Sequence, residues 1–551
     1  MLNAMFFDEQ ASNAIGCIVC RNLPTSDRSA RMSRPPFSTT AAGRCFLNNK
    51  RKRPYAGASR YAARSISAHD FSTSCDDGVV EGVFLFHRHG DRTPARRLVP
   101  DTYAEHENAF WTKRIPKGAS LYDSLSDLFP TDIHFSNNDG KFFDTRRSPY
   151  GFLTWKGMDQ MRLAGRECAL RYSRLGHQAV ANESTGNCVH GAAGRELLET
   201  WNIQVFSTCY LRTVKSVQCF LHGLLGTDDQ RSYEEFQGCD IKAQSLRDEI
   251  ALEASRERPV DPNDLVGVYV RDRSIDTLNA FDRNPDLMKE LVSEVVNTDH
   301  FQKHDALAKP LALELCNLLP GLLAPGQKLF GGPSGINWIH AADHFICRRS
   351  HGRPYSEFCA GANDDRRIEE ALASMHRPVI QHLAWRFRQW YKSAPLLAAI
   401  AAPSLREIEG QIRRAIDVGG EHRAPMVVYS CHDVTILSIL YGLGAEFLED
   451  DDGNDWKCFW PSYASTLVIE LVRTKEAKGD IDDTHFLRII MNGKPVRLVA
   501  MRNKPDKDLG LSDFSAIIDG LENAGGWDVN GRLADDPACS SVKRDMSGWT
   551  G

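Results

Sequence analysis

The sequence predicts an α/β fold in which a mixed or parallel central sheet is flanked by helices and carries an inserted, mostly helical cap domain. Three apolar runs, at residues 82–86, 203–208 and 426–430, each lead into polar residues, and helical patterns follow the second and third. Short apolar, β-branched runs are typical of buried strands, and open α/β sheets bind ligands at the carboxyl ends of such strands. Between residues 227 and 399, several helical patterns follow one another.

These patterns divide the chain into a discontinuous α/β core at residues 76–226 and 400–530, a helical cap at 227–399, a leading segment at 1–75 and a tail at 531–551. A composition of 42% apolar and 25% charged residues supplies a sizeable core and excludes a disordered, collagen-like or coiled-coil chain. No apolar run approaches the roughly 20 residues that span a bilayer. The 15 cysteines are scattered and lack paired metal-binding spacings, which argues against a zinc ribbon or a dense disulfide scaffold.

The leading segment is basic, whereas the rest of the chain is acidic. Residues 1–75 contain 11 Lys and Arg and 4 acids, so the remainder carries −5 − 7 = −12, which argues against nucleic acid or an anionic membrane as a partner. The ten basic residues between 28 and 68, without an acid and among Ser, Ala and Thr, predict a mitochondrial transit peptide. The alternatives are a disordered basic tail or an upstream gene-model extension, with a cytoplasmic or a secretory or lysosomal location.

The first apolar run ends in a cluster of cations around a histidine. Arg88 and Arg92 flank His89, and Gly90 permits a tight turn. The planar fork of arginine grips phosphate oxygens in pairs. Like charge lowers the pKa of the imidazole, which leaves a ring nitrogen free to attack phosphorus. His89 is therefore a candidate nucleophile, and the alternative is a basic turn that holds a hydrogen-bonded histidine.

The second and third runs place further polar groups at strand ends. Arg212 lies at a predicted helix start, where backbone N–H groups and the helix dipole favour an anion. His432 and Asp433 connect the third run to an apolar helix. The structural alternatives are a salt-bridging role for Arg212 and an N-cap role for Asp433.

The run Arg88-His89-Gly90-x-Arg92-x-Pro94 resembles the signature of the histidine acid phosphatases, branch two of the histidine phosphatase superfamily. The residues around Arg212 and the dipeptide at 432–433 are similar to two further elements of this family, although cysteines occupy 209 and 431 in place of the usual Asp or Asn and Gly or Ala. The helix predicted from Leu153 to about Gly176 also has a counterpart there. The resemblance extends from about residue 82 to 514 and is weakest between 227 and 399.

The resemblance implies an acid phosphatase that hydrolyses phosphate monoesters through a phosphohistidine intermediate, without a metal or another cofactor. It implies that His89 is the nucleophile, that Asp433 is the proton donor and that four residues bind the phosphate: Arg88, Arg92, Arg212 and His432. The partner is then a small phosphate monoester. Within the family the likeness is nearest to lysophosphatidic acid phosphatase, on residues 432–435 and 460–464. The alternatives are an inositol-phosphate (phytase-like) phosphatase, a phosphomutase and a non-catalytic phospholigand-binding homologue.

Other patterns complete the prediction. Residues 464–472 and 486–491 are predicted strands, and Asn492-Gly493 predicts a hairpin turn. Ser350-His351-Gly352-Arg353-Pro354 echoes the motif around His89 but lacks a preceding apolar strand, so it is predicted to be a surface loop.

Overall fold

The computed structural model describes twelve stretches of the chain: residues 78–116, 125–126, 128–133, 148–173, 189–225, 266–323, 334–356, 365–418, 423–448, 459–474, 484–503 and 508–525. The predicted targeting segment at 1–75 and the predicted tail at 531–551 lie outside these residues. None of the described helices is long and apolar enough to cross a membrane.

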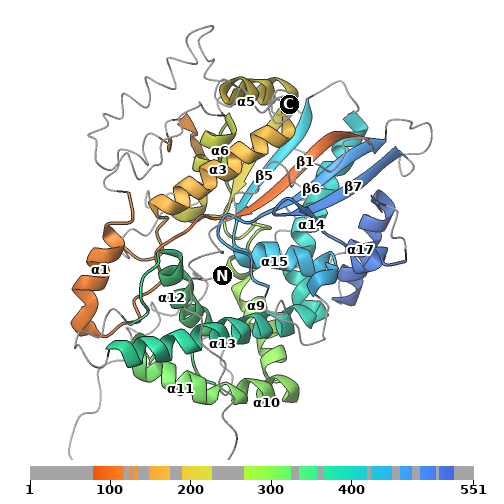
Figure 1. The fold of residues 1–551 in the computed structure, drawn as a ribbon. Coiled ribbons are helices and arrows are strands. Elements are labelled where there is room, and N and C mark those ends of the chain that lie inside the picture. Colours follow the sequence, from red (N-terminus) through yellow and green to blue (C-terminus); the bar gives the residue numbers. More distant parts are fainter. Residues whose placement is uncertain are drawn as a thin grey trace, which may run out of the picture.

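A mixed sheet forms the centre of the fold (Figure 1), with the strand order β2-β4-β3-β5-β1-β6-β7-β8 and β9 paired to β7. Its strands are β1 (Gly78–Arg88), β2 (Thr131–Ile133), β3 (Trp201–Ser207), β4 (Val268–Val270), β5 (Ala424–Cys431), β6 (Thr466–Thr474), β7 (His485–Met491), β8 (Lys494–Pro495) and β9 (Leu509–Gly510). The strands from β2 to β1 are parallel, and β6 to β9 pair antiparallel. The predicted fold class is confirmed.

Successive side chains along β1 point to opposite sides of the sheet, so they pack into two different cores. Val83 and Leu85 pack into one core beneath α3 (Trp155–Tyr172), α5 (Val189–Thr200) and α6 (Leu211–Leu225). Phe84 and Phe86 pack into the other, with α14 (Ala394–Val418), α15 (Asp433–Gly442) and α17 (Leu511–Ala524). Both faces of β1 are therefore covered, as the continuous apolar run predicts.

The described part of the region predicted to be a cap, residues 266–323, 334–356 and 365–399, is mostly helical. It contains α8 (Ala280–Arg283), α9 (Pro285–Val296), α10 (Asp299–Leu307), α11 (Lys309–Leu318), α12 (Trp338–Ser350) and α13 (Asp365–Lys392). In Figure 1 the helices α9 to α13 gather below the sheet, opposite α3, α5 and α6. Their buried residues belong to the same core as Phe84 and Phe86 of the sheet.

Two features of the region at 227–399 differ from a purely helical insertion. The strand β4 lies inside this range and pairs with both β2 and β3. The helix α14 starts at Ala394 and continues to Val418, across the predicted boundary between cap and core.

The helix predicted to end near Gly176 ends at Tyr172. The predicted hairpin turn is confirmed, since Asn492 and Gly493 have φ of 48° and 76° between β7 and β8.

Candidate active site

The structure brings the six predicted site residues to the wall of one pocket. Arg88 is the last residue of β1, and His89 and Arg92 follow it in the next loop. Arg212 is the second residue of α6, and His432 and Asp433 directly follow β5. The hollow encloses about 480 Å³ of empty volume, counting space open to solvent, and its polar lining comprises Arg88, His89, Arg92, Arg212, His432, Asp433 and Asp343. The parallel register explains this convergence, because Arg88 pairs with Cys431, and Ser207 at the end of β3 pairs with Ser430.

A close contact between two glycines shapes the loop after β1. A Cβ atom on Gly90 would lie 2.2 Å from the carbonyl oxygen of Gly157 at the start of α3, and one on Gly157 would lie 2.1 Å from the carbonyl oxygen of Asp91. The loop therefore lies directly on the first turn of α3. Ser216 of α6 accepts a hydrogen bond from the Gly90 amide at 3.1 Å, and Gln160 accepts one from the Asp91 amide at 2.8 Å. Two helices thus fix the backbone that carries the candidate nucleophile.

His89 has the protonation state that a nucleophile needs. Its Nδ1 lies 2.8 Å from the Gly90 carbonyl oxygen, and because a carbonyl only accepts, Nδ1 carries the hydrogen and Nε2 keeps a free lone pair. Burial, followed by the charges of Arg212, Arg88 and Arg92, lowers the pKa of His89 well below 6.5. The ring is therefore neutral at physiological pH.

His432 lies against His89 at the end of β5. The two ring centroids are 5.6 Å apart in an edge-to-face arrangement, and Nε2 of His432 is 3.2 Å from the hydroxyl of Thr208. Burial and the charge of Arg212 lower the pKa of His432 well below 6.5. It therefore adds a neutral hydrogen-bonding group rather than a fourth cation.

The predicted proton donor, Asp433, is the first residue of α15. Its Oδ1 accepts a hydrogen bond from the Val434 amide at 2.9 Å, while Oδ2 lies 2.8 Å from Nη2 of Arg88 and 3.0 Å from Nε1 of Trp460. His432, not Asp433, occupies the N-cap position. The N-cap alternative for Asp433 is therefore wrong, and its side chain belongs to the pocket.

Arg212 is a buried cation with incomplete hydrogen bonding. It is 8% exposed, and neither Nε nor Nη2 has a hydrogen-bond partner among the described residues. Its guanidinium lies 4.5 Å from the ring centroid of Tyr210. Burial, followed by the charge of Arg92, lowers the pKa of Arg212 to about 10. Because buried charges and donors are normally paired, an anion in the pocket is the natural partner.

Sequence reasoning did not identify Asp343, which α12 places in the same pocket. Its Oδ1 lies 2.8 Å from Nη2 of Arg92, and its Oδ2 accepts hydrogen bonds from Nη1 of Arg92 at 3.1 Å and from the Ala95 amide at 2.7 Å. Burial opposes the charge of Arg92, but the pairing with Asp343 raises the pKa of Arg92 well above its ordinary value. The only signal in the sequence is an acid among the apolar residues of a helix.

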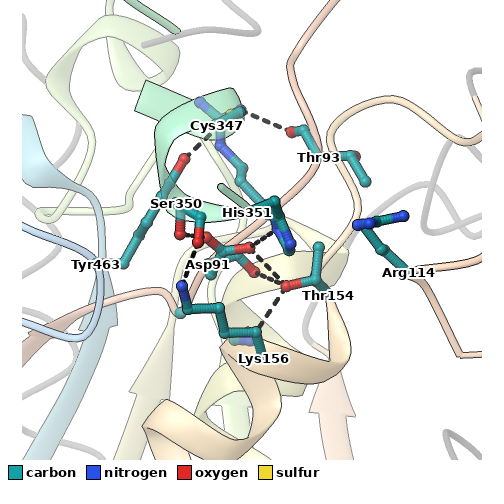
Figure 2. Close-up of polar contacts among 12 residues, drawn as sticks. Asp91, Thr93, Arg114, Thr154, Lys156, Cys347, Ser350, His351 and Tyr463 are labelled. Atoms are coloured by element: carbon teal, nitrogen blue, oxygen red, sulfur yellow. Dashed lines mark hydrogen bonds and ion pairs between the residues drawn. The ribbon is translucent and has the colours of Figure 1, made fainter. Parts of the chain in front are cut away.

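The segment at 350–354 is not the surface loop that was predicted. Figure 2 shows Ser350 and His351, at the end of α12, directed at Asp91 in the loop after β1. His351 Nε2 is 2.7 Å from Asp91 Oδ1, the Ser350 hydroxyl contacts Oδ2, and the Thr154 hydroxyl donates to Oδ1 at 2.6 Å. Although burial alone would raise it, these hydrogen bonds lower the pKa of Asp91. This prediction was wrong because it missed a partner about 260 residues away.

Apart from the six predicted site residues and Asp343, the pocket wall is apolar. Two helices supply most of it, with Ile339, Ala342 and Ile346 from α12 and Leu383 and Phe387 from α13. The spacing at three, four and seven residues places these side chains on one face of each helix. The ring of Trp460 completes this wall, with its centroid 5.0 Å from that of Phe387.

Residues 79–492 match the histidine phosphatase superfamily (branch 2), and the chain belongs to this family. Membership implies phosphatase activity. A comparison with curated proteins found no match to the chain.

Solved structures that are similar to this chain include bacterial phytases. The phytase of Citrobacter braakii is 12% identical and has a TM-score of 0.39, with 80% of this chain and 98% of that chain covered. Hafnia alvei phytase in complex with myo-inositol hexakis sulphate is 12% identical, with a TM-score of 0.41 and coverage of 82% and 99%. Bifidobacterium longum multiple inositol polyphosphate phosphatase in complex with inositol hexasulfate is 12% identical, with a TM-score of 0.40 and coverage of 82% and 95%. Likeness at this level says nothing about the substrate of this chain.

Proposed function

We propose that this chain hydrolyses phosphate monoesters through a phosphohistidine intermediate, and that its substrates are esters of an uncharged, apolar alcohol such as lysophosphatidic acid. Nε2 of His89 attacks phosphorus and forms a P–N bond as the ester P–O bond breaks. The carboxyl proton of Asp433 passes to the departing oxygen. A water molecule then attacks phosphorus, returns a proton to Asp433 and releases inorganic phosphate from His89.

The arginines and His432 bind the phosphoryl oxygens in this mechanism. Arg212 offers two donors that no described residue accepts from, so it binds an anion without first breaking a bond within the pocket. Arg88 contacts the candidate acid, Asp433. When Arg88 turns toward a bound phosphoryl group, its ion pair with Asp433 is released. Positioned charge of this kind is the main contribution to phosphoryl transfer.

The apolar wall is the observation that supports the substrate class. Apart from the six predicted site residues and Asp343, the described lining consists of aliphatic and aromatic side chains from α12, α13, Val434 and Trp460. Each buried methylene of a leaving group against such a wall contributes about 0.8 kcal/mol. An inositol polyphosphate would instead require cations for its other phosphates, and the described lining supplies none beyond the three arginines.

A substrate panel tests this proposal directly. We expect kcat/KM to be highest for lysophosphatidic acid, to rise with acyl chain length and to be lowest for inositol hexakisphosphate, with phosphotyrosine between them. Comparable turnover of all three substrates would reject the apolar substrate class.

The variant His89→Ala tests the nucleophile. It should lose turnover and the acid-labile ³²P label of the intermediate, whereas His376→Ala, which changes a half-buried cap histidine, should keep both. Equal phosphate release by the wild type and His89→Ala would reject the assignment. Transfer of the phosphoryl group to an acceptor other than water would identify a phosphomutase, and binding without turnover would identify a phospholigand-binding protein.

A further inference from the structure

We propose that Asp343 is a specificity-determining residue whose carboxylate competes with phosphate for Arg92, which weakens phosphate binding and matches the pocket to a single phosphoryl group on an uncharged alcohol. This inference rests on the proposed function and assigns a role to a residue outside the predicted set. It concerns the strength of anion binding, which is measurable apart from turnover.

The geometry of the pair is that of a carboxylate in the place of an anionic ligand. Both terminal nitrogens of Arg92 contact Asp343, at 2.8 and 3.1 Å. This side-by-side arrangement is the one that arginine also uses to bind phosphate. The Nη1 atom of Arg92 donates in addition to the Thr93 carbonyl at 2.9 Å. A phosphoryl group therefore has to share or displace the carboxylate of Asp343 to reach the two terminal nitrogens of Arg92, and only Nε has no partner among the described residues.

The three pocket arginines differ in how strongly internal groups compete for them. Arg212 has two donors without a partner among the described residues. Arg88 uses one nitrogen for Asp433, which takes part in the proposed chemistry, and another for the Pro461 carbonyl at 2.5 Å. Only Arg92 has both terminal nitrogens paired with one carboxylate, on a residue that the mechanism does not use.

Asp343 is held firmly in this position, because the same helix is anchored at its far end. Seven residues further along α12, the Ser350 hydroxyl bonds to Asp91. Nε2 of the next residue, His351, lies 2.7 Å from Oδ1 of Asp91 (Figure 2). The amide of Ala95 donates to Asp343 Oδ2 at 2.7 Å. The competing carboxylate is thus fixed on both sides of the loop that carries Arg92, and α12 does not have to move for it to act.

The charge of the pocket leads to the same conclusion. Three arginines and two aspartates line it, so the net charge is 3 − 2 = +1 when both acids are ionised, and +2 when Asp433 is protonated. The second value balances one phosphate dianion. Loss of the Asp343 charge would raise each value by one and would favour more highly charged ligands.

Calorimetric titration with inorganic phosphate tests the inference in the full-length protein. We expect Asp343→Asn to lower the Kd for phosphate about tenfold, which corresponds to removal of one competing charge-assisted contact. Asp305→Asn is the matched control, because Asp305 is a buried acid that pairs with His382 at 2.9 Å within the cap. This control should keep the Kd of the wild type. In a second arm, the kcat/KM ratio of inositol hexakisphosphate to p-nitrophenyl phosphate should rise in Asp343→Asn.

The outcomes separate this inference from the proposed function. An unchanged or higher Kd in folded Asp343→Asn would overturn the inference and would mean that Asp343 only supports Arg92. If circular dichroism shows that Asp343→Asn does not fold, Asp343→Ser, which keeps an acceptor for the Ala95 amide, decides by the same criterion. A wild type that binds phosphate but releases none from any monoester would reject the proposed function and leave the inference to the Kd comparison. A wild type that does not bind phosphate would reject both.

Discussion

Replacement of Arg212 by methionine should stabilise the fold and abolish phosphate binding at the same time. The folded state lowers the pKa of this guanidinium from its ordinary value to about 10. This lowering corresponds to about 3 kcal/mol by which the folded protein disfavours the charge. Loss of the contact with the Tyr210 ring offsets about 1 kcal/mol. We therefore expect the free energy of unfolding to increase by about 2 kcal/mol in phosphate-free buffer.

Urea unfolding with and without phosphate measures both effects. Phosphate at 100 times its Kd should stabilise the wild type by about 2.7 kcal/mol through mass action. The same concentration should not change the midpoint for Arg212→Met. In phosphate-free buffer, Arg212→Met should therefore have a higher free energy of unfolding than the wild type. This difference should vanish or reverse when phosphate is added.

Arg271→Met is the matched control for this experiment. Arg271 is buried as well, but both of its terminal nitrogens bond to Glu407, at 2.7 and 2.6 Å. Its removal leaves a buried carboxylate without its cation, which should cost about 3–5 kcal/mol. If Arg212→Met is destabilised like Arg271→Met, or gains as much stability from phosphate as the wild type, Arg212 is an ordinary structural arginine and the argument for an anion site fails.

Two further predictions concern acid stability and the apolar wall. Burial lowers the pKa of His87 to about 4, so between pH 6.5 and 4 the unfolded chain binds a proton that the folded chain does not, and stability is lost as pH falls. As pH falls through this range, the wild type should therefore lose about 1.4 kcal/mol more of its free energy of unfolding per pH unit than His87→Phe does. Parallel plots of unfolding free energy against pH for the two proteins would contradict this. In Ile346→Ser, kcat/KM for a long-chain lysophosphatidic acid should drop about tenfold, while that for glycerol phosphate stays constant. An equal loss on both substrates would show that this side chain does not contact the leaving group.

Much of the site follows from local patterns and one topological rule. The runs at 82–86, 203–208 and 426–430 lie within or at the ends of β1, β3 and β5, which are parallel neighbours. Polar residues that follow parallel strands gather at one edge of the sheet. No long-range information was needed to expect Arg88, Arg212 and His432 at that edge, because the chain direction already specifies it.

The contributions of α12 required the structure. A helical pattern identifies the buried face of residues 338–350, but it does not reveal that Asp343 in this face meets Arg92, 251 residues earlier in the chain. The contact between His351 and Asp91 is equally distant in sequence. The strand β4 was missed for a related reason. Its residues, Val-Tyr-Val, favour a strand, but three residues are fewer than the run of four to eight that identifies one, so the pairing with β2 and β3 is what reveals it.

The origin of the pocket residues suggests how far chemistry and specificity are separable in this fold. The proposed nucleophile, the proposed acid and the arginines come from strand ends and the starts of α6 and α15, whereas most of the apolar wall and Asp343 come from α12 and α13. Under the proposed function, substitutions at Ile339 or Ile346 should therefore alter the contacts with the leaving group and leave the proposed phosphate-binding residues in place. At the last turn of α12, the residues for specificity are no longer separate from those for chemistry. Ser350 and His351 bond there to Asp91, which lies two residues after His89. Changes there should alter the position of the proposed nucleophile for every substrate, and we expect a loss of kcat without a change in substrate preference, which would distinguish them from changes in the wall.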